Sequence, residues 1–198
     1  CESPLTIRAL LEKHSSEVLR YALLSGRYRS SLTWSDELLA QARASLDGLY
    51  QSLRDASSEQ SITSADFQDM GISEYPKVVV DALSDDLNTP KALAGMHELA
   101  NQLRRASDSE ARNAAVQQLL AGGSLLGLLI QTPDAYFTQG LPGGPSSITA
   151  DAIEALIEQR KAARASGDYA GADRIRDDLL ASGIELEDSR EGTRWRKL

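Results

Sequence analysis

A mainly α fold is predicted for this 198-residue chain: an antiparallel helical bundle followed by a small helix–helix–β-hairpin module. Aromatic residues make up only 5% of the sequence while Ala and Leu are abundant, a balance that favours packed helices over a β-sandwich. Apolar residues recur at three- and four-residue steps through most of the chain, as on one face of a helix. Only the end of the chain alternates apolar and polar residues, as strands of a hairpin do.

The bundle is predicted to begin with short helices and to continue with a long one. Residues 5–14 and 16–24 fit two short helices, and a turn then leads to Ser35. Ser35 can cap the long helix, in which Asp36 and Glu37 favour the positive end of the helix dipole. The apolar stripe of this helix, which ends near residue 55, consists of Leu38, Leu39, Ala42, Leu46, Leu49, Tyr50 and Leu53.

The middle of the chain predicts a connection and two further helices. Residues 56–71 are rich in Ser, Asp and Gln, which indicates a surface connection, and a helix is expected around 72–84. In the next helix Thr89 can act as N-cap and Pro90 can take the first helical position, where its missing N–H costs nothing. The apolar stripe of that helix consists of Leu93, Met96, Leu99, Ala100 and Leu103.

A last bundle helix is expected over residues 110–130. Gly122-Gly123 should weaken or bend it, because each glycine costs about 1 kcal/mol relative to alanine. Four consecutive helices with short or polar connections predict an up-and-down bundle.

The clearest boundary is the stretch Gln139-Gly-Leu-Pro-Gly-Gly-Pro-Ser-Ser147. Two prolines and three glycines in nine residues do not sustain a helix and are typical of a linker. The chain is therefore divided into a helical segment (1–34), a helical bundle domain (35–138), a linker (139–147) and a C-terminal module (148–198).

The C-terminal module is predicted as two helices and a hairpin. Thr149 can cap the first helix and Asp168 the second, which ends at Ser182-Gly183. The segments 184–187 and 193–196 then alternate apolar and polar residues.

The charge of the chain argues against a general polyanion binder, because the formal net charge is −8. Residues 1–159 carry 12 Lys or Arg against 21 Asp or Glu, whereas residues 160–198 carry 9 against 8. A contact with nucleic acid would therefore be local and lie in the C-terminal fifth. No apolar run approaches the roughly 20 residues that a membrane span needs. The single cysteine, Cys1, suits a reducing cytoplasm, which is the expected location.

No catalytic constellation is found in the sequence. His14 and His97 are far apart, and Cys1 stands alone, so no zinc-binding spacing is present. The sequence also lacks a P-loop, a G-x-G-x-x-G and a G-x-S-x-G motif. Asp85-Asp86 can be interpreted as a metal-binding or acid–base pair, but a helix-entry turn is the favoured interpretation.

A series of motifs covers essentially the whole chain in one order. They are Thr6-Ile-Arg-Ala-Leu-Leu, Glu17-Val-Leu-Arg-Tyr21, Leu24-Ser-Gly-Arg-Tyr-Arg-Ser30, Asp85-Asp-Leu-Asn-Thr-Pro90, Ile153-Glu-Ala-Leu-Ile-Glu-Gln-Arg160, Asp168-Tyr-Ala-Gly-Ala-Asp173, Gly183-Ile-Glu-Leu-Glu-Asp188 and Glu191-Gly-Thr-Arg-Trp-Arg196. The first three resemble cysteinyl-tRNA synthetases just after their second ATP signature loop. The fourth resembles the entry to their helical bundle, and the rest resemble their anticodon-binding end.

The resemblance also indicates what lies outside these residues. In the family, two ATP signatures and a zinc site that grips the substrate thiol would lie upstream of Cys1, so this chain itself is expected to bind neither ATP nor zinc. Cys1-Glu2-Ser3-Pro4 departs from the family's Leu-Gly-Asn-Phe, and Arg27 replaces a common histidine. Amino-acid activation is therefore not assigned to these residues.

The resemblance implies positions for RNA contacts. Residues at the family's anticodon-contacting positions are Arg164, Tyr169, Asp173, Arg176 and Asp188, with Tyr169 standing where a tryptophan is common. Arg27 and Arg29 are candidates for a contact with the tRNA stem, and a solvated turn is the equal alternative. Asp173 and Arg176 also have the spacing of an intrahelical ion pair. Trp195 is interpreted as a core anchor of the hairpin in preference to a stacking platform.

The function expected from the resemblance is anticodon recognition by the C-terminal region of a cysteinyl-tRNA synthetase. The expected partners are a tRNA with the cysteine anticodon and an N-terminal catalytic domain that attaches cysteine to it at the expense of ATP, with no membrane involved. Two alternatives remain open at this point. The chain can be a stand-alone helical interaction protein diverged from the synthetase, or the end of a cysteine-sugar ligase. The Glu191–Arg196 tail favours the tRNA enzyme over the sugar ligase.

Overall fold

The computed structural model describes residues 6–56, 74–139, 150–189 and 192–197, and these are arranged in two compact units. One unit spans Ser15–Pro133, and the other combines Cys1–His14 with Asp134–Leu198. The predicted connection over 56–71 and the predicted linker over 139–147 lie outside the described residues apart from their first residue, and so does the predicted cap Thr149.

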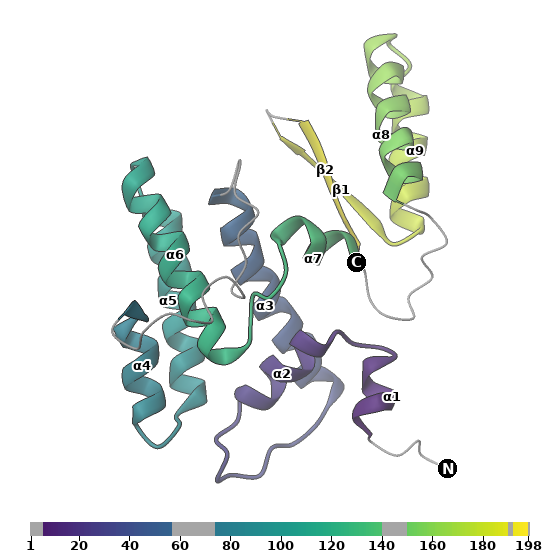
Figure 1. Cartoon of the computed structure of the whole chain (residues 1–198). Helices are drawn as coiled ribbons and strands as arrows, with labels where there is room; N and C mark the ends of the chain where they lie inside the picture. The colour runs from purple at the N-terminus through teal and green to yellow at the C-terminus, as the bar shows by residue number, and fades with distance from the viewer. Residues whose placement is uncertain (1–5, 57–73, 140–149, 190–191, 198) are drawn as a thin grey trace. The chain divides into compact units, whose positions relative to one another are not determined.

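The unit Ser15–Pro133, called the bundle below, is helical throughout its described part. Its helices are α2 (Ser16–Leu24), α3 (Asp36–Ala56), α4 (Lys77–Ser84), α5 (Thr89–Arg105) and α6 (Ser109–Leu126). Helix α2 packs on α3, α4 on α5, and α5 on both α3 and α6 (Figure 1). The predicted helical bundle is therefore confirmed, and α2 contacts α3 across the predicted division between residues 34 and 35.

The helix starts in the bundle follow local capping chemistry, with one correction. Ser35 caps α3 as predicted, because its Oγ accepts a hydrogen bond from the Leu38 N–H at 3.2 Å. The prediction that Thr89 caps α5 is wrong: the Asn88 Oδ1 accepts from the Lys91 N–H at 3.3 Å, and the helix starts at Thr89. Thr89 instead donates its hydroxyl to the Gly26 carbonyl at 3.2 Å, so α5 begins one residue earlier than expected.

Gly122-Gly123, which are expected to weaken or bend the last bundle helix, do not interrupt α6, which runs through both residues to Leu126 and so ends before the predicted residue 130. Both glycines are buried where neighbouring segments approach closely. A Cβ on Gly122 would lie 2.7 Å from the Met96 sulfur, and one on Gly123 would lie 2.8 Å from the Leu128 carbonyl oxygen. Tight packing of the neighbouring segments offsets the low helix propensity of glycine here.

The centre of the bundle contains a buried carboxylate. Glu17 is fully buried and accepts hydrogen bonds from the Tyr50 hydroxyl at 2.9 and 3.1 Å and from the Leu129 N–H. The Tyr50 oxygen in turn accepts from the Gln131 N–H at 3.2 Å. This chain of hydrogen bonds attaches the segment after α6 to α2 and α3.

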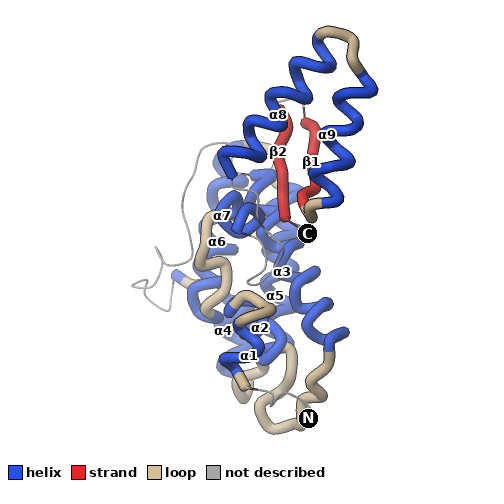
Figure 2. Tube along the Cα trace, turned by 90° about the vertical axis from the view of Figure 1, so that its right-hand side faces the viewer, coloured by secondary structure: helices blue, strands red, loops and turns tan. Residues whose placement is uncertain are grey.

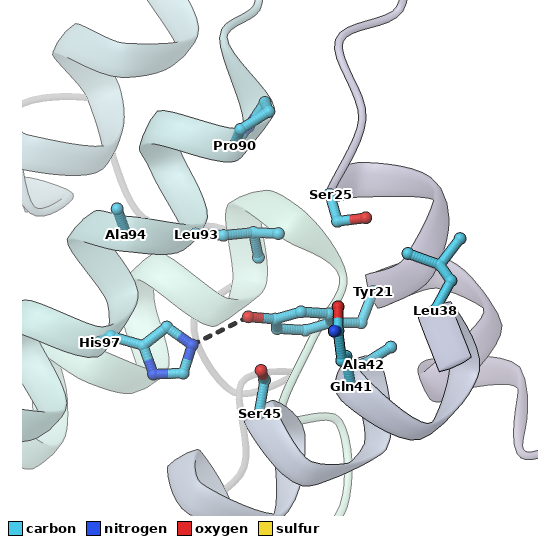
Figure 3. Close-up of a pocket in the computed structure, with 10 residues that line it drawn as sticks. All are labelled: Tyr21, Ser25, Leu38, Gln41, Ala42, Ser45, Pro90, Leu93, Ala94 and His97. Atoms are coloured by element: carbon cyan, nitrogen blue, oxygen red, sulfur yellow. Dashed lines mark hydrogen bonds between the residues drawn. The ribbon is translucent and has the colours of Figure 1, made fainter. Parts of the chain in front are cut away.

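A cavity of about 320 Å³ opens between α2, α3 and α5 (Figure 3). At one side the Tyr21 hydroxyl and the His97 Nε2 are joined by a 2.8 Å hydrogen bond, drawn as the dashed line. Burial, with a smaller contribution from the charge of Arg104, lowers the pKa of His97 below its usual value. His97 is therefore a structural histidine held in its neutral form.

The second unit contains the C-terminal module, formed by α8 (Ala150–Ala165), α9 (Tyr169–Ala181), β1 (Ile184–Ser189) and β2 (Gly192–Lys197). The short helices α1 (Ile7–Leu11) and α7 (Pro133–Gln139) belong to this unit too, except for Pro133. Helix α8 packs along α9, and α9 contacts β1 (Figures 1 and 2). The module thus has the predicted helix–helix–hairpin order.

The turns of the module confirm the capping expected for α9. The Asp168 Oδ1 accepts from the Gly171 N–H at 2.9 Å at the start of α9. At its end, Gly183 has a φ of +76°, a left-handed conformation that favours glycine. The strands β1 and β2 are antiparallel, and Leu186 lies opposite Trp195. The module's core is small and consists of Ile153, Leu179, Ile184, Leu186 and Trp195.

Candidate nucleic-acid interface

One face of the hairpin and one face of α8 bring a carboxylate and a guanidinium together. On β1, Ile184, Leu186 and Asp188 share a face because side chains alternate along a strand. Ile184 and Leu186 on that face are buried in the module core, so Asp188 continues a face that packs against the helices. On α8, Arg160 lies seven residues after Ile153 and therefore continues the apolar stripe by two turns.

Arg160 and Asp188 form a bidentate ion pair. The Arg160 Nη1 and Nη2 donate to Asp188 Oδ1 and Oδ2 at 2.9 and 2.7 Å, and the Thr193 hydroxyl donates to Oδ1 at 2.7 Å. The side chain of Arg160 is 5% exposed, whereas that of Asp188 is 44% exposed. The hydrogen bonds from Arg160 and Thr193 hold the pKa of Asp188 far below its usual range, so this carboxylate is ionised.

Arg164 lies one turn beyond Arg160 on α8 and reaches the same carboxylate. Its Nη1 lies 3.6 Å from Asp188 Oδ2, and its side chain is 52% exposed. The structure therefore brings together two of the residues predicted from the sequence, Arg164 and Asp188. At this point a donor group and an acceptor group lie side by side at the surface, and Arg160 lies buried behind them.

Three further predicted residues share one exposed stripe of α9. Tyr169, Asp173 and Arg176 follow at steps of four and three residues, and all three are exposed, with Tyr169 at 67%. Asp173 and Arg176 are both described, and no ion pair joins these two side chains, so the alternative of an intrahelical pair is not realised. The hydrogen bond with Asp188 is the main cause of the raised pKa of Arg160, and the charge of Asp173 adds a smaller contribution.

The basic strand β2 is balanced by the acidic strand β1. The register places Arg196 opposite Glu185 and Arg194 opposite Glu187. Arg196 donates its Nε to Glu185 at 2.7 Å and also lies 3.6 Å from Glu187. Trp195 is 7% exposed within the module core, which confirms its interpretation as an anchor of the hairpin.

The predicted stem contacts lie in a polar turn of the bundle. Arg29 pairs with Asp86 at 3.2 Å, and its guanidinium lies 5.0 Å from the centre of the Tyr28 ring. Arg27 and Arg29 line a cavity of about 300 Å³ together with Asp86. Asp85 faces Lys91 at 3.6 Å, so each carboxylate of the Asp85-Asp86 pair has a cationic partner. Among the described residues no group of three or more His, Cys, Asp or Glu side chains is placed to hold a metal ion.

Sequence reasoning missed Arg160 as part of this interface. Two signals were present: a cation on the apolar stripe of α8 and a carboxylate on the inward face of β1. Burial of a guanidinium is costly unless a partner compensates its charge, and a carboxylate on the inward face of a strand is such a partner.

Comparisons with known proteins agree with this architecture. Residues 78–131 match the DALR domain family, and residues 149–196 match the cysteinyl-tRNA ligase anticodon binding domain family. The chain is 44% identical over 195 residues to a cysteine–tRNA ligase of Marinobacter nauticus. It is 42% identical to one of Xanthomonas campestris and 40% identical to one of Escherichia coli.

These matches cover 97% of this chain but only about 40% of each relative. The chain thus spans less than half the length of the curated relatives it matches. None of the described helices is long and apolar enough to cross a membrane. Two family matches in the expected order and 40–44% identity along the chain lead to one conclusion. The chain belongs to the cysteinyl-tRNA ligase family and corresponds to the C-terminal part of its members, with a DALR domain and an anticodon-binding domain.

Proposed function

We propose that the C-terminal module of this chain binds tRNA and recognises the cysteine anticodon. The observation that carries the proposal is the juxtaposition of Arg164 and Asp188 at the surface of a domain that matches the anticodon-binding family. Tyr169, Asp173 and Arg176 are exposed on α9, the helix that packs along α8.

The chemistry of these side chains suits unpaired bases. Anticodon bases lie in a loop, and proteins read such bases by stacking and by hydrogen bonds to their edges. Arg164 and Arg176 can donate to base oxygen and nitrogen atoms, whereas Asp173 and Asp188 can accept from exocyclic amino groups. The exposed ring of Tyr169 offers a stacking surface.

The acidic character of the chain favours discrimination over raw affinity. A stacked base contributes about 1–3 kcal/mol, and a good edge contact also contributes about 1–3 kcal/mol. Association costs at least about 4 kcal/mol, and a net charge of −8 adds no general attraction to phosphates. The 198-residue chain should therefore bind tRNA weakly by itself and distinguish anticodons well.

In this proposal the anticodon-binding module serves a larger reaction in the cytoplasm. A catalytic domain of the kind expected upstream would bind ATP, zinc and cysteine and attach cysteine to the tRNA that this chain selects. The residues of this chain would then contribute to the choice of substrate, and the chemical step would belong to that domain.

The proposal is tested by titrating the 198-residue chain with tRNA bearing the cysteine anticodon and with a variant changed at one anticodon base. Both titrations need the same salt concentration, because affinity for nucleic acid falls steeply with salt. We expect tighter binding to the cysteine anticodon by about tenfold or more, as for one good edge contact. Equal affinity for the two tRNAs would contradict anticodon recognition and favour the stand-alone interaction protein.

Single substitutions in the C-terminal module test whether its side chains distinguish the two tRNAs. Arg164→Ala and Arg176→Ala should each reduce the ratio of the two affinities, whereas phosphate contacts would lower both affinities alike. Arg174→Ala is the matched control, because Arg174 is an exposed cation on α9 outside the predicted set. If Arg174→Ala reduced the ratio of the two affinities as much as Arg176→Ala does, the assignment of discrimination to Arg176 would be contradicted.

A further inference from the structure

We propose that Arg160 is a positioning residue for anticodon recognition, which fixes the carboxylate of Asp188 beside the guanidinium of Arg164. The proposal rests on the proposed function and adds a residue that does not itself reach the RNA. In this proposal the specificity of the surface at Asp188 depends on three residues: Arg160, which is buried, and Asp188 and Arg164, which are exposed.

The burial of the three side chains separates their roles. Arg160 is 5% exposed, so its guanidinium is not available to a base. Asp188 and Arg164 are 44% and 52% exposed, and their facing groups lie 3.6 Å apart. An acceptor and a donor held at this separation match the edge of a base, which presents donors and acceptors side by side. Arg160 can influence that match only through Asp188.

The geometry of the pair restricts the carboxylate to one orientation. Arg160 donates to both oxygens of Asp188 at 2.9 and 2.7 Å, and a forked guanidinium defines the plane of the carboxylate that it binds. Thr193, directly across the hairpin from Asp188, donates to Oδ1 at 2.7 Å. Three donors from α8 and β2 therefore set the direction in which the remaining exposed lone pairs of Asp188 point.

The charges around Asp188 keep it an acceptor. Within the described part of the chain, Arg160 and Arg164 are the cations that pair with this carboxylate, Thr193 is its neutral donor, and the charge of Asp173 acts on Arg160. The hydrogen bonds and charge of Arg160 favour the ionised form of Asp188, which accepts hydrogen bonds and does not donate them. The second cation, Arg164, remains at the surface with its outward donors available.

Stability alone is a weak reason for an arginine at this position. Ile153, Leu156 and Ile157 form the helix face that Arg160 continues, and an apolar side chain there would extend the module core. Buried ion pairs often contribute little net stability relative to apolar replacements. A positioning role accounts for the charge, the fork and the burial of Arg160 together.

The test measures the ratio of affinities for the tRNA with the cysteine anticodon and for a set of single-base anticodon variants. Arg160→Met, Arg160→Lys, Asp188→Asn and the double variant Arg160→Met/Asp188→Asn are compared with the unchanged chain. Circular dichroism and thermal unfolding fix a temperature at which every variant used is folded. We expect Asp188→Asn and Arg160→Met each to lower the ratio about tenfold, the size of one edge contact.

Two readouts separate positioning from a structural role. If Arg160 acts through Asp188, the double variant should have the same ratio as Asp188→Asn alone, because no oriented carboxylate remains to be lost. Arg160→Lys keeps the charge without the fork, so its ratio should fall between those of Arg160→Met and the unchanged chain. A structural role would lower the melting temperature and leave the ratio unchanged. If Arg160→Met does not fold, Arg160→Lys carries the test.

Each outcome has one meaning. If the unchanged chain discriminates between the tRNAs and both Arg160→Met and Arg160→Lys keep the full affinity ratio, the positioning role is overturned and anticodon recognition stands. Retention of the full ratio by Asp188→Asn would overturn the positioning role as well. Absence of discrimination by the unchanged chain would overturn the proposed function together with this inference.

Discussion

Glu17 and Arg160 are charged side chains that folding removes from solvent, one in each of the two units. Burial raises the pKa of Glu17, and the hydrogen bonds from Tyr50 and the Leu129 N–H partly offset this effect. Arg160 differs because its partner, Asp188, is itself charged and half-exposed. At the residue scale, the buried carboxylate depends on neutral donors and the buried guanidinium on an anion, so each is sensitive to the loss of a single partner.

Replacement of Tyr50 by Phe tests the support of Glu17. Tyr50→Phe removes the hydroxyl that donates to Glu17 and that accepts from the Gln131 N–H. We expect the free energy of unfolding to fall by about 2 kcal/mol, the size expected for a hydrogen bond to a charged group. Urea denaturation followed by circular dichroism measures it. Tyr21→Phe is the control, since its half-buried hydroxyl bonds a neutral imidazole and should contribute about 1 kcal/mol. A loss in Tyr50→Phe no larger than in Tyr21→Phe would contradict this account.

Helix α6 shows how packing between elements overrides local propensity. Gly122 and Gly123 are poor helix formers, yet the helix continues through them because Met96 and the carbonyl of Leu128 approach their backbone closely. The helix then ends at Gly127, which has a φ of +65°. At the element scale, the glycine pair permits close approach between segments, and the single glycine stops the helix.

Two glycine-to-alanine substitutions make a matched pair at this scale. In Gly123→Ala the new Cβ meets a backbone carbonyl at 2.8 Å, so the bundle should lose about 1–3 kcal/mol through overpacking. In Gly48→Ala, within α3, the new Cβ meets nothing within 4 Å, so the bundle should gain up to about 1 kcal/mol from helix propensity. Thermal unfolding of the two variants should therefore shift in opposite directions. A stabilised Gly123→Ala would show that the segment after α6 can move without cost.

For the whole molecule, the ionisable groups of the two units respond to different pH ranges. In the bundle, His97 has a lowered pKa, so its contribution to stability is complete at neutral pH and is lost as the pH falls below about 6.5. The raised pKa of Glu17 acts in the opposite direction, because the folded bundle takes up this proton before the unfolded chain does. In the module, the lowered pKa of Asp188 contributes stability that is lost only below about pH 4.

The two units should therefore lose stability at different pH values. Trp34→Phe leaves Trp195, in the module core, as the sole tryptophan, so its fluorescence follows the module, and circular dichroism follows mainly the helices. As the pH falls below about 6.5, the melting temperature of the helical signal should fall, reduced in size by the opposite contribution of Glu17, while the Trp195 transition stays constant. Below about pH 4 the Trp195 transition should fall too. His97→Gln should remove the first decline. A decline that persists in His97→Gln would assign it to another group.

Much of the fold could be predicted because its signals are local. The apolar stripe of α3, the caps Ser35 and Asp168, and the alternation in β1 and β2 all act over a few residues. The errors were also local: Asn88 competed with Thr89 for the cap, and α6 ends at Leu126 with Gly127 as its C-cap, before the predicted residue 130. Of the candidate site, the sequence predicted Arg164 and Asp188, which the structure brings together, and missed Arg160, because the pairing of a buried cation depends on another element.

The order and kind of the elements, apart from α7, follow from local sequence patterns, and the family follows from the motifs. Which charged groups meet depends on how the elements pack in three dimensions. Arg160 and Asp188 are 28 residues apart in the chain, and Glu17 and Leu129 are 112 residues apart. Periodicity and capping report on neighbours within one or two turns. The burial of a charge is decided by whichever distant partner the packed elements supply.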